Sequence, residues 1–408
     1  MAKDLTSESP ALFPVQTPSP TPRLKWPTVK HLFWLFVISR AFFMELGGLA
    51  YIYLPHAWVE SPPNTLPPSG QLLYHVTFGL WAHWDGLWYL SIANMGYANR
   101  PTATAFFPLY PLGVHLLGGG VVGGVLLSLL CFAVTLWFLF RLTQYEFGDR
   151  IAWNAVLALA FFPTSFYANA VYSESLFMAA AIGSLYFART RRYRIAGPLA
   201  MAATLVSMYG LLLAIPLLYL AWTQEGHRIR PLLYSLWAPL GLVLYMGFLL
   251  IRFGDPLVFE HAQSNWGRHF QWVGATLWAA TVKAWQVAGQ AFSLHTLFAT
   301  GMPQLSASNF YNWIFALFLL IMLALSVKYL PAYLWIYEVL ALLVPFSYPA
   351  TGNPLMSLPR LVLEAFPTFI TLGLVISRKP WHKTLYFIAS LPLGILFVAL
   401  YATAHWVA

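Results

Sequence analysis

Charged side chains and cysteine are scarce in this chain, and the two shortages exclude several classes of protein. Only 9% of the 408 residues are Asp, Glu, Lys or Arg, whereas 59% are hydrophobic. A mean hydropathy of +0.65 is too high for a soluble domain of this length. Cys131 is the only cysteine and falls within an apolar run, so the sequence has neither a disulfide framework nor a thiolate metal site.

Acidic residues are scarcer than basic ones, 13 against 22, which gives a net charge of +9. The basic residues cluster between apolar runs, and positively charged loops mark the cytoplasmic side of membrane proteins. We therefore interpret the charge as a signal of topology and expect no nucleic-acid partner. The sequence shows no internal repeat, which counts against the transporter folds that are built from repeats.

Long apolar runs occupy most of the chain and predict an all-α polytopic membrane protein, because about 20 apolar residues cross the hydrocarbon layer. We predict about 11 transmembrane helices, with the N-terminus in the cytoplasm and the C-terminus outside. The predicted segments are 31–54, 120–142, 151–169, 175–188, 196–208, 211–222, 232–252, 308–327, 331–347, 359–377 and 384–403.

The chain divides into a tail and one membrane domain. Residues 1–30 contain six prolines among Ser and Thr, so we predict a disordered cytoplasmic tail rather than a signal peptide. Residues 31–408 form the integral-membrane domain. Its external loops, 55–119 and 253–307, are too hydrophobic to be free, and we expect each to hold short helices along the membrane interface. The short loops and proline-rich tail favour a bacterial plasma membrane over the endoplasmic reticulum.

One apolar segment is too short for the two crossings that its flanks require. Residues 195–222 are apolar over 28 positions, and both flanks are basic. We therefore predict two shortened helices that are broken between Ser207 and Gly210. Non-helical backbone at membrane depth is tolerated only inside protein or facing water, so the break is expected to face an internal cavity. Gly210 is expected there for backbone geometry that other residues cannot adopt.

Asp85 is an isolated carboxylate in an aromatic, half-polar segment, residues 81–89 (WAHWDGLWY). Such a segment between apolar spans predicts a wet cavity at the membrane surface. No Lys or Arg stands near Asp85 in the sequence, so we interpret it as a candidate general base. The alternative is an ion pair, or a cap at the start of an interfacial helix.

Three further charged residues complete the candidate chemistry. Glu174 lies between two serines at the start of a predicted span, either as a second catalytic carboxylate or as a charge that complements the helix dipole. Arg268 and Arg360 are candidates for binding a lipid phosphate, because arginine binds phosphate with two parallel hydrogen bonds. The alternatives are contact with lipid headgroups for Arg268 and a helical ion pair with Glu364 for Arg360.

Other polar and aromatic side chains are candidates for substrate binding, through stacking on sugar faces or hydrogen bonds to hydroxyls. They are His83, Trp84, Tyr89, Tyr97, Tyr172, Tyr209, His261 and Asn265. Interfacial aromatic belts have the same composition, so stacking is one of two explanations for the rings. The histidines have no spacing typical of a metal site, and we expect no metal and no other cofactor.

Six motifs occur in order along most of the chain. They are the Trp-Asp segment 81–89, AFFPLYPL at 105–112, FPTSF at 162–166, YSESLF at 172–177, GDPL at 254–257 with HAQ at 261–263 and WGR at 266–268, and SLPR at 357–360 with FP at 366–367. From about residue 31 onward the chain resembles the PIG-V-type mannosyltransferases. These are polytopic glycosyltransferases of the GT-C superfamily that use a lipid-phosphate sugar.

This resemblance implies a GT-C fold and transfer of mannose with inversion. The donor would be polyprenyl or dolichyl phosphate-mannose, a co-substrate rather than a cofactor. The acceptor would be a hydroxyl of a lipid, glycolipid or protein on the extracytoplasmic side. Asp85 matches the acidic residue expected to be the catalytic base, and Glu174 matches the acidic residue at the outer end of the hairpin 151–190.

The sequence departs from the family at one place. Related sequences commonly carry a basic residue in the broken segment, where this chain has Ser207-Met208-Tyr209, so a phosphate contact is expected from elsewhere. Three other interpretations remain open: a GT-C enzyme with another sugar donor, a polytopic transporter or flippase, and a non-catalytic relative that serves as a subunit of a complex. The notable charges cluster on one face of the predicted topology, which favours an enzyme.

Overall fold

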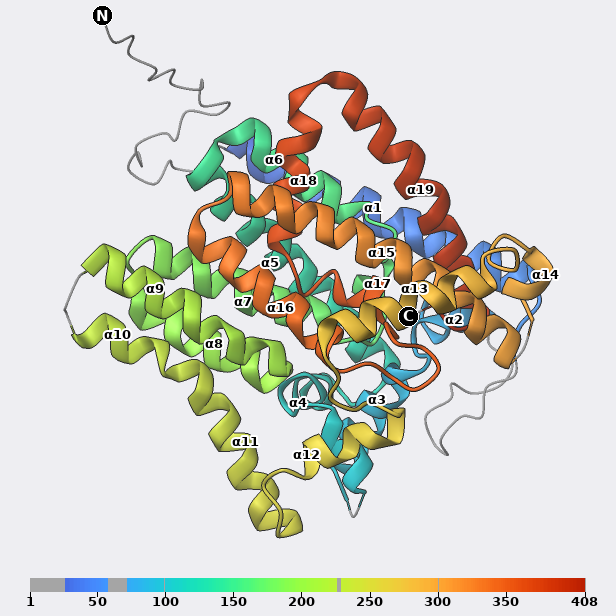
Figure 1. Cartoon of the computed structure of the whole chain (residues 1–408), viewed down its shortest axis with the longest axis horizontal. Coiled ribbons are helices and arrows are strands. Elements are labelled where there is room, and N and C mark those ends of the chain that lie inside the picture. The colour runs from blue at the N-terminus through green and yellow to red at the C-terminus, as the bar shows by residue number, and fades with distance from the viewer. Residues whose placement is uncertain (1–25, 58–71, 99, 226–228, 300, 408) are drawn as a thin grey trace, which may run out of the picture.

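The computed structural model describes residues 26–57, 72–98, 100–225, 229–299 and 301–407. Within these ranges the chain is helical, with two isolated β-bridges and no strand, as Figure 1 shows. The prediction of an all-α protein is therefore confirmed. The predicted tail lies outside the described residues, apart from its last few, which already belong to the first helix.

Long or medium-length helices correspond to all the predicted membrane segments. They are α1 (Trp26–Tyr53), α5 (Val121–Phe147), α6 (Asp149–Ala160), α7 (Glu174–Arg189), α8 (Tyr193–Val206), α9 (Ala214–Glu225), α10 (Ile229–Ser235), α11 (Trp237–Phe253), α15 (Met302–Tyr329), α16 (Ala332–Ser347), α18 (Pro367–Arg378) and α19 (Pro380–Ala402).

The lengths of these helices differ widely. In the described residues, α1, α5, α15 and α19 are long and apolar enough to cross a membrane, and α10 with α11, bent by 41°, would make a fifth crossing. Helix α16, by contrast, has 16 residues, or about 24 Å at 1.5 Å per residue, which is short of the hydrocarbon thickness of about 30 Å. The chain is an integral, multi-pass membrane protein, and the number of 11 crossings stays a prediction.

Helices from the two ends of the chain pack together. Helix α6 lies against α18, and α1 lies against α19, while α5, α7 and α8 pack in succession (Figure 1). The C-terminal helices therefore complete the bundle that the N-terminal helices begin.

Helix α6 is shorter than predicted, because regular structure stops at Ala160 and resumes as the 3₁₀ helix η3 (Ser165–Asn169). The fully buried guanidinium of Arg40 on α1 supplies hydrogen bonds to backbone carbonyl groups at this interruption. It donates hydrogen bonds to the carbonyl oxygens of Ala160 (2.7 Å) and Ser165 (2.6 Å) and to Asn169 Oδ1 (3.0 Å). A buried cation needs such partners, and buried carbonyls need donors, so each side of this contact stabilises the other.

The predicted break in the segment 195–222 is confirmed. Helix α8 ends at Val206, Ser207 is extended, and the 3₁₀ helix η4 (Met208–Leu213) leads into α9. The expected reason for Gly210 is wrong, because its φ is not positive. A Cβ on Gly210 would lie 2.1 Å from the backbone nitrogen of Thr204, so glycine is required by the close approach of η4 to α8.

Short helices fill both of the loops that are predicted to be external, as expected. The first contains α2 (Leu72–Thr77), η1 (Gly79–Trp81), α3 (Asp85–Met95), η2 (Pro101–Ala105) and α4 (Leu109–Leu116), and the second contains α12 (Val258–His261), η5 (Ala262–Trp266), α13 (Val273–Val287) and α14 (Leu294–Leu297). Helix α13 packs on α15 with Thr276 buried, while Trp278 and Trp285 are 71% and 85% exposed. Exposed tryptophans on one side of a helix are typical of a membrane interface.

We predict that His269, in the second external loop, and Lys379, between α18 and α19, lie on opposite sides of the membrane. Both residues are exposed. In a Cys131→Ala background, His269→Cys is expected to react with a membrane-impermeant maleimide in intact cells. Lys379→Cys is expected to react only after permeabilisation. Labelling of both positions in intact cells would contradict the predicted topology.

We predict that Gly210→Ala destabilises the protein, because the new methyl group would meet the backbone of α8. Gly247→Ala in α11 is the matched control, since a Cβ there meets nothing within 4 Å. An alanine at an open helical position should be neutral or stabilising by about 0.5–1 kcal/mol. Thermal unfolding in detergent should give a lower midpoint for Gly210→Ala alone, and equal midpoints for the two variants would refute the close approach.

Candidate active site

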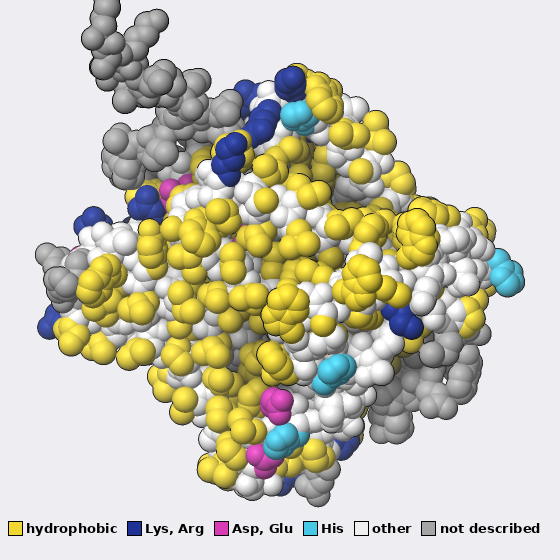
Figure 2. All heavy atoms as spheres, viewed as in Figure 1, with side chains coloured by type: hydrophobic (Ala, Val, Ile, Leu, Met, Phe, Trp, Pro, Cys, Tyr) yellow, Lys and Arg dark blue, Asp and Glu magenta, His cyan; other side chains and the backbone are white. Residues whose placement is uncertain are grey.

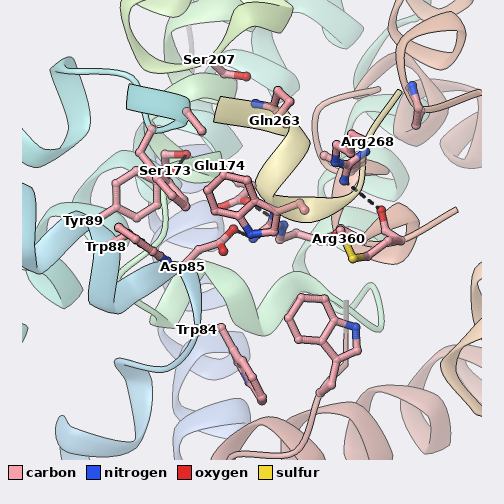
Figure 3. Close-up of a pocket in the computed structure, with 18 of the residues that line it drawn as sticks. Trp84, Asp85, Trp88, Tyr89, Ser173, Glu174, Ser207, Gln263, Arg268 and Arg360 are labelled. Carbon is pink, nitrogen blue, oxygen red and sulfur yellow. Dashed lines mark hydrogen bonds and ion pairs between the residues drawn. The ribbon is translucent and has the colours of Figure 1, made fainter. Parts of the chain in front are cut away.

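A cavity of about 980 Å³ lies where the external helices meet the broken ends of the membrane helices (Figure 3). Segments far apart in the sequence line it. Its polar and aromatic lining residues are Trp84, Asp85, Trp88, Tyr89, Phe106, Ser173, Glu174, Ser207, Tyr209, Glu260, Gln263, Trp266, Arg268, Gln304, Tyr348, Ser357, Arg360, Glu364, His405 and Trp406. All four residues predicted to carry the chemistry, Asp85, Glu174, Arg268 and Arg360, line this one cavity.

The guanidinium of Arg360 lies between two carboxylates. Its Nη1 donates to Asp85 Oδ2 at 2.5 Å, and its Nε lies 3.3 Å from Glu174 Oε1. Arg360 is on α17 (Leu358–Leu361), whereas the two carboxylates begin α3 and α7. Figure 3 shows the three side chains converging in the middle of the cavity. Asp85 therefore forms an ion pair and stands at the start of a helix, as the alternative to a catalytic role expected. It also faces the cavity.

The helices that carry Asp85 and Arg360 both begin after a strained residue. Trp84, before α3, has φ 53°, and Ser357, before α17, has φ 70°. Non-glycine residues rarely adopt positive φ, and such strain costs about 1–3 kcal/mol per residue. These turns direct the first residues of both short helices toward one point, and strained backbone of this kind is concentrated at functional sites.

Glu174 is more buried than Asp85, with side-chain exposures of 5% and 20%. Glu174 Oε2 is buried and has no hydrogen-bond partner among the described residues. Next to it, Ser173 Oγ and the Tyr89 hydroxyl are 2.8 Å apart. This part of the wall therefore offers an unsatisfied acceptor beside hydroxyl groups, an arrangement suited to binding a polar molecule.

Arg268 lies on the other side of the cavity, and its guanidinium donates to two carbonyl oxygens, those of Tyr348 (3.1 Å) and Met356 (3.3 Å). Among the described residues no carboxylate lies within ion-pair distance of Arg268. Burial lowers the pKa of Arg268 below the usual value for arginine. An arginine with unneutralised charge at a cavity wall is suited to bind an anionic group.

Rings form two further parts of the wall. Trp84 and Trp406 meet edge to face with their centroids 5.0 Å apart. Trp88 stacks on Phe106 at 5.6 Å, and Trp266 meets Phe106 edge to face at 5.7 Å. These rings give the cavity apolar surfaces beside its charged centre.

Five residues expected to contact substrate do not line the cavity. Tyr172 lies behind it, with its ring 5.2 Å from the Arg360 guanidinium and its hydroxyl bonded to the carbonyl of His83. His83 itself is enclosed, and burial lowers its pKa to about 4, so it is neutral. Tyr97 donates to the Phe106 carbonyl (2.7 Å), and Asn265 donates to the Ala262 carbonyl.

The fifth, His261, is exposed and lies outside the cavity. Its Nδ1 is 2.9 Å from Asp255 Oδ2 and its Nε2 is 3.8 Å from Glu260 Oε2. Within the described ranges no group of three or more His, Cys, Asp or Glu residues is arranged to hold a metal ion. The absence of a required metal remains an expectation.

The comparisons with known proteins agree with the resemblance in the sequence. No family model matches the chain. An alignment of 114 residues is 37% identical to GPI mannosyltransferase 2 of Drosophila pseudoobscura pseudoobscura, and it covers 24% of this chain and 25% of that protein. Over this alignment the chain is similar to a mannosyltransferase, as the sequence motifs indicated. The alignment spans about a quarter of the relative's length, so the activity of the whole protein is a proposal.

Solved structures give more distant likenesses. The oligosaccharyltransferase of Archaeoglobus fulgidus, tethered with an acceptor peptide, has a TM-score of 0.47 and 11% identity, over 93% of this chain and 56% of that one. The same organism's AglB with an inhibitory peptide and a dolichol-phosphate has a TM-score of 0.44 and 12% identity, over the same shares of the two chains.

Several residues that line the cavity were missed in the sequence analysis. Glu364, treated there only as a helical neighbour of Arg360, accepts hydrogen bonds from Ser207 Oγ at 3.3 Å on both carboxylate oxygens. Trp266 belongs to the same WGR motif as Arg268, and this motif could have identified Trp266 as a cavity residue. Trp406 had no signal in the sequence, because it follows the last apolar run and reaches the cavity through tertiary contacts with Trp84 and Gln304.

Proposed function

We propose that this protein is a membrane glycosyltransferase that moves a mannosyl residue from a lipid-phosphate donor to a hydroxyl acceptor, with inversion, on the extracytoplasmic side. The observation that carries this proposal is the presence of Asp85 and two arginines in one cavity. We expect this cavity at the extracytoplasmic end of the helix bundle, from the predicted topology. The local match to a named mannosyltransferase favours mannose as the sugar. We expect a bacterial plasma membrane, on the basis of the short loops.

The chemistry requires a base for the acceptor and positive charge near the donor phosphate. The acceptor hydroxyl gives its proton to Asp85, and its oxygen forms a bond to the anomeric carbon. The bond from that carbon to the phosphate oxygen breaks on the opposite face, and its electron pair leaves with the phosphate. Because this leaving group is already charged, it needs cationic stabilisation more than it needs a proton.

The geometry supports separate tasks for the two ends of the cavity. Arg360 holds Asp85 Oδ2, and no described residue donates a hydrogen bond to Oδ1, which is left for an acceptor hydroxyl. Arg268 has charge available for the donor phosphate. Arg360 would contribute to the phosphate site while it positions Asp85. The Nε atom of Arg360 pairs with the carboxylate of Glu174.

The assay is turnover of the purified full chain with synthetic polyprenyl phosphate-mannose, measured as release of polyprenyl phosphate, with the glucose analogue in parallel. Consumption of the mannose donor supports the proposal. Preference for the glucose analogue would assign another sugar. Movement of the donor across a vesicle membrane without consumption would instead assign a flippase.

We predict that Asp85→Asn lowers turnover by a factor of about 10²–10⁴, because the amide keeps the shape but does not accept the proton. Donor binding should persist. Asp255→Asn is the matched control, since Asp255 pairs with exposed His261 and does not line the cavity. Residual activity of Asp85→Asn above about a tenth of wild type would exclude Asp85 as the base.

We predict that Arg268→Gln weakens donor binding by about 1.5–3 kcal/mol, the usual loss of one charge-assisted contact. Lys283→Gln removes the same charge from the exposed side of α13 and should leave the affinity unchanged. Equilibrium binding of a fluorescent polyprenyl phosphate to both variants measures the difference. Equal affinities would remove Arg268 from the phosphate site.

A further inference from the structure

A second hollow, of about 440 Å³, lies away from the candidate active site, where the start of α8 meets α10. Residues from two separate stretches of the chain line it: Arg191, Arg192, Tyr193, Arg194, Ile195, Arg230, Pro231 and Tyr234. None of these residues lines the active-site cavity. We call this hollow the arginine pocket.

Most of the positive charge in the arginine pocket has no carboxylate partner among the residues that the structure describes. Arg191 lies 3.5 Å from Glu225. For Arg192, Arg194 and Arg230, no carboxylate of the described residues lies within ion-pair distance. Basic residues are expected at one face of any membrane protein. That expectation does not explain why arginines from two distant stretches surround one hollow together with tyrosine rings.

Exposed apolar side chains lie directly beside these arginines. Ile195 is 43% exposed next to Arg194, and Ile229, Leu233 and Leu236 on and beside α10 are 67%, 52% and 57% exposed. Figure 2 shows basic side chains at the left margin, where α9 ends and α10 begins in Figure 1, beside a broad apolar surface. The surface therefore presents cationic and apolar groups side by side.

We propose that the arginine pocket binds the phosphate-bearing headgroup of an anionic phospholipid, whose acyl chains lie along the exposed Ile229, Leu233 and Leu236. A phosphodiester matches the guanidinium donors of Arg192, Arg194 and Arg230 in charge and geometry. A soluble phosphorylated molecule would satisfy the arginines and leave the apolar residues uncovered. The adjoining apolar surface therefore favours a lipid.

The position of the arginine pocket connects it to the rest of the fold. Helix α8 begins at the pocket and ends, 14 residues later, at the break that lines the active-site cavity. That length is about 21 Å. A lipid that joins the start of α8 to α10 would stabilise the region that holds η4, so we expect binding to raise the unfolding midpoint. This inference does not depend on the proposed enzymatic activity.

The test compares two double variants of the full chain in detergent, each lowering the charge by the same amount. Arg194→Gln with Arg230→Gln takes one arginine from each side of the arginine pocket. Lys379→Gln with Lys383→Gln removes two exposed lysines outside it. Native mass spectrometry and thermal unfolding are recorded with phosphatidylglycerol and with phosphatidylcholine of the same acyl chains.

Wild type and the lysine variant should bind phosphatidylglycerol in preference to phosphatidylcholine, and the arginine variant should lose about 25-fold in apparent affinity. This magnitude assumes about fivefold per basic residue beside an anionic lipid. Equal losses in both variants, or no preference between the lipids, would overturn the proposal. If inorganic phosphate raises the unfolding midpoint as much as phosphatidylglycerol does, the result would also overturn the proposal, in favour of a soluble ligand. If the double arginine variant does not fold, Arg192→Gln provides the same comparison.

Discussion

The ion pairs of Arg360 with Asp85 and Glu174 join three helices that the sequence places far apart. Taking charges out of water is costly unless they are paired with good geometry, and removing one partner leaves an uncompensated charge. The wall of the cavity therefore depends on all three side chains at once. The strained turns at Trp84 and Ser357 persist because this contact and its surroundings hold the short helices in place.

Interrupted helices create the space around this charged centre. Backbone that leaves a helix at membrane depth needs other partners, and each interruption here has one. Arg40 donates to the carbonyls at the end of α6, and Ser207 Oγ accepts from the amide of Tyr209 (3.4 Å) and donates to Glu364. The breaks are therefore stable parts of the fold that bring polar groups to the cavity.

The two arginines of the cavity have different surroundings, and this difference decides what each can do. The charge of Arg360 is shared between two carboxylates, whereas Arg268 contacts only carbonyl oxygens among the groups that the structure describes. Arg268 is therefore better placed to bind a phosphate, and Arg360 to orient the carboxylates. The broken segment carries no basic residue, and Arg268, which lines the same cavity as Tyr209, is the residue that we propose for the phosphate contact.

The sequence alone determined the helical class, the position of the break at Ser207 and four of the charged residues that line the cavity. Hydrophobic run length, basic flanks and isolated charges are local signals. The sequence did not determine which charges pair. The contact of Asp85 with Arg360 spans 275 positions, and no local pattern encodes it. For the same reason Tyr97 and His261 were expected at the site and lie elsewhere. Only packing decides which face of a short helix meets the cavity, and packing also places Trp406, from the end of the chain, against Trp84.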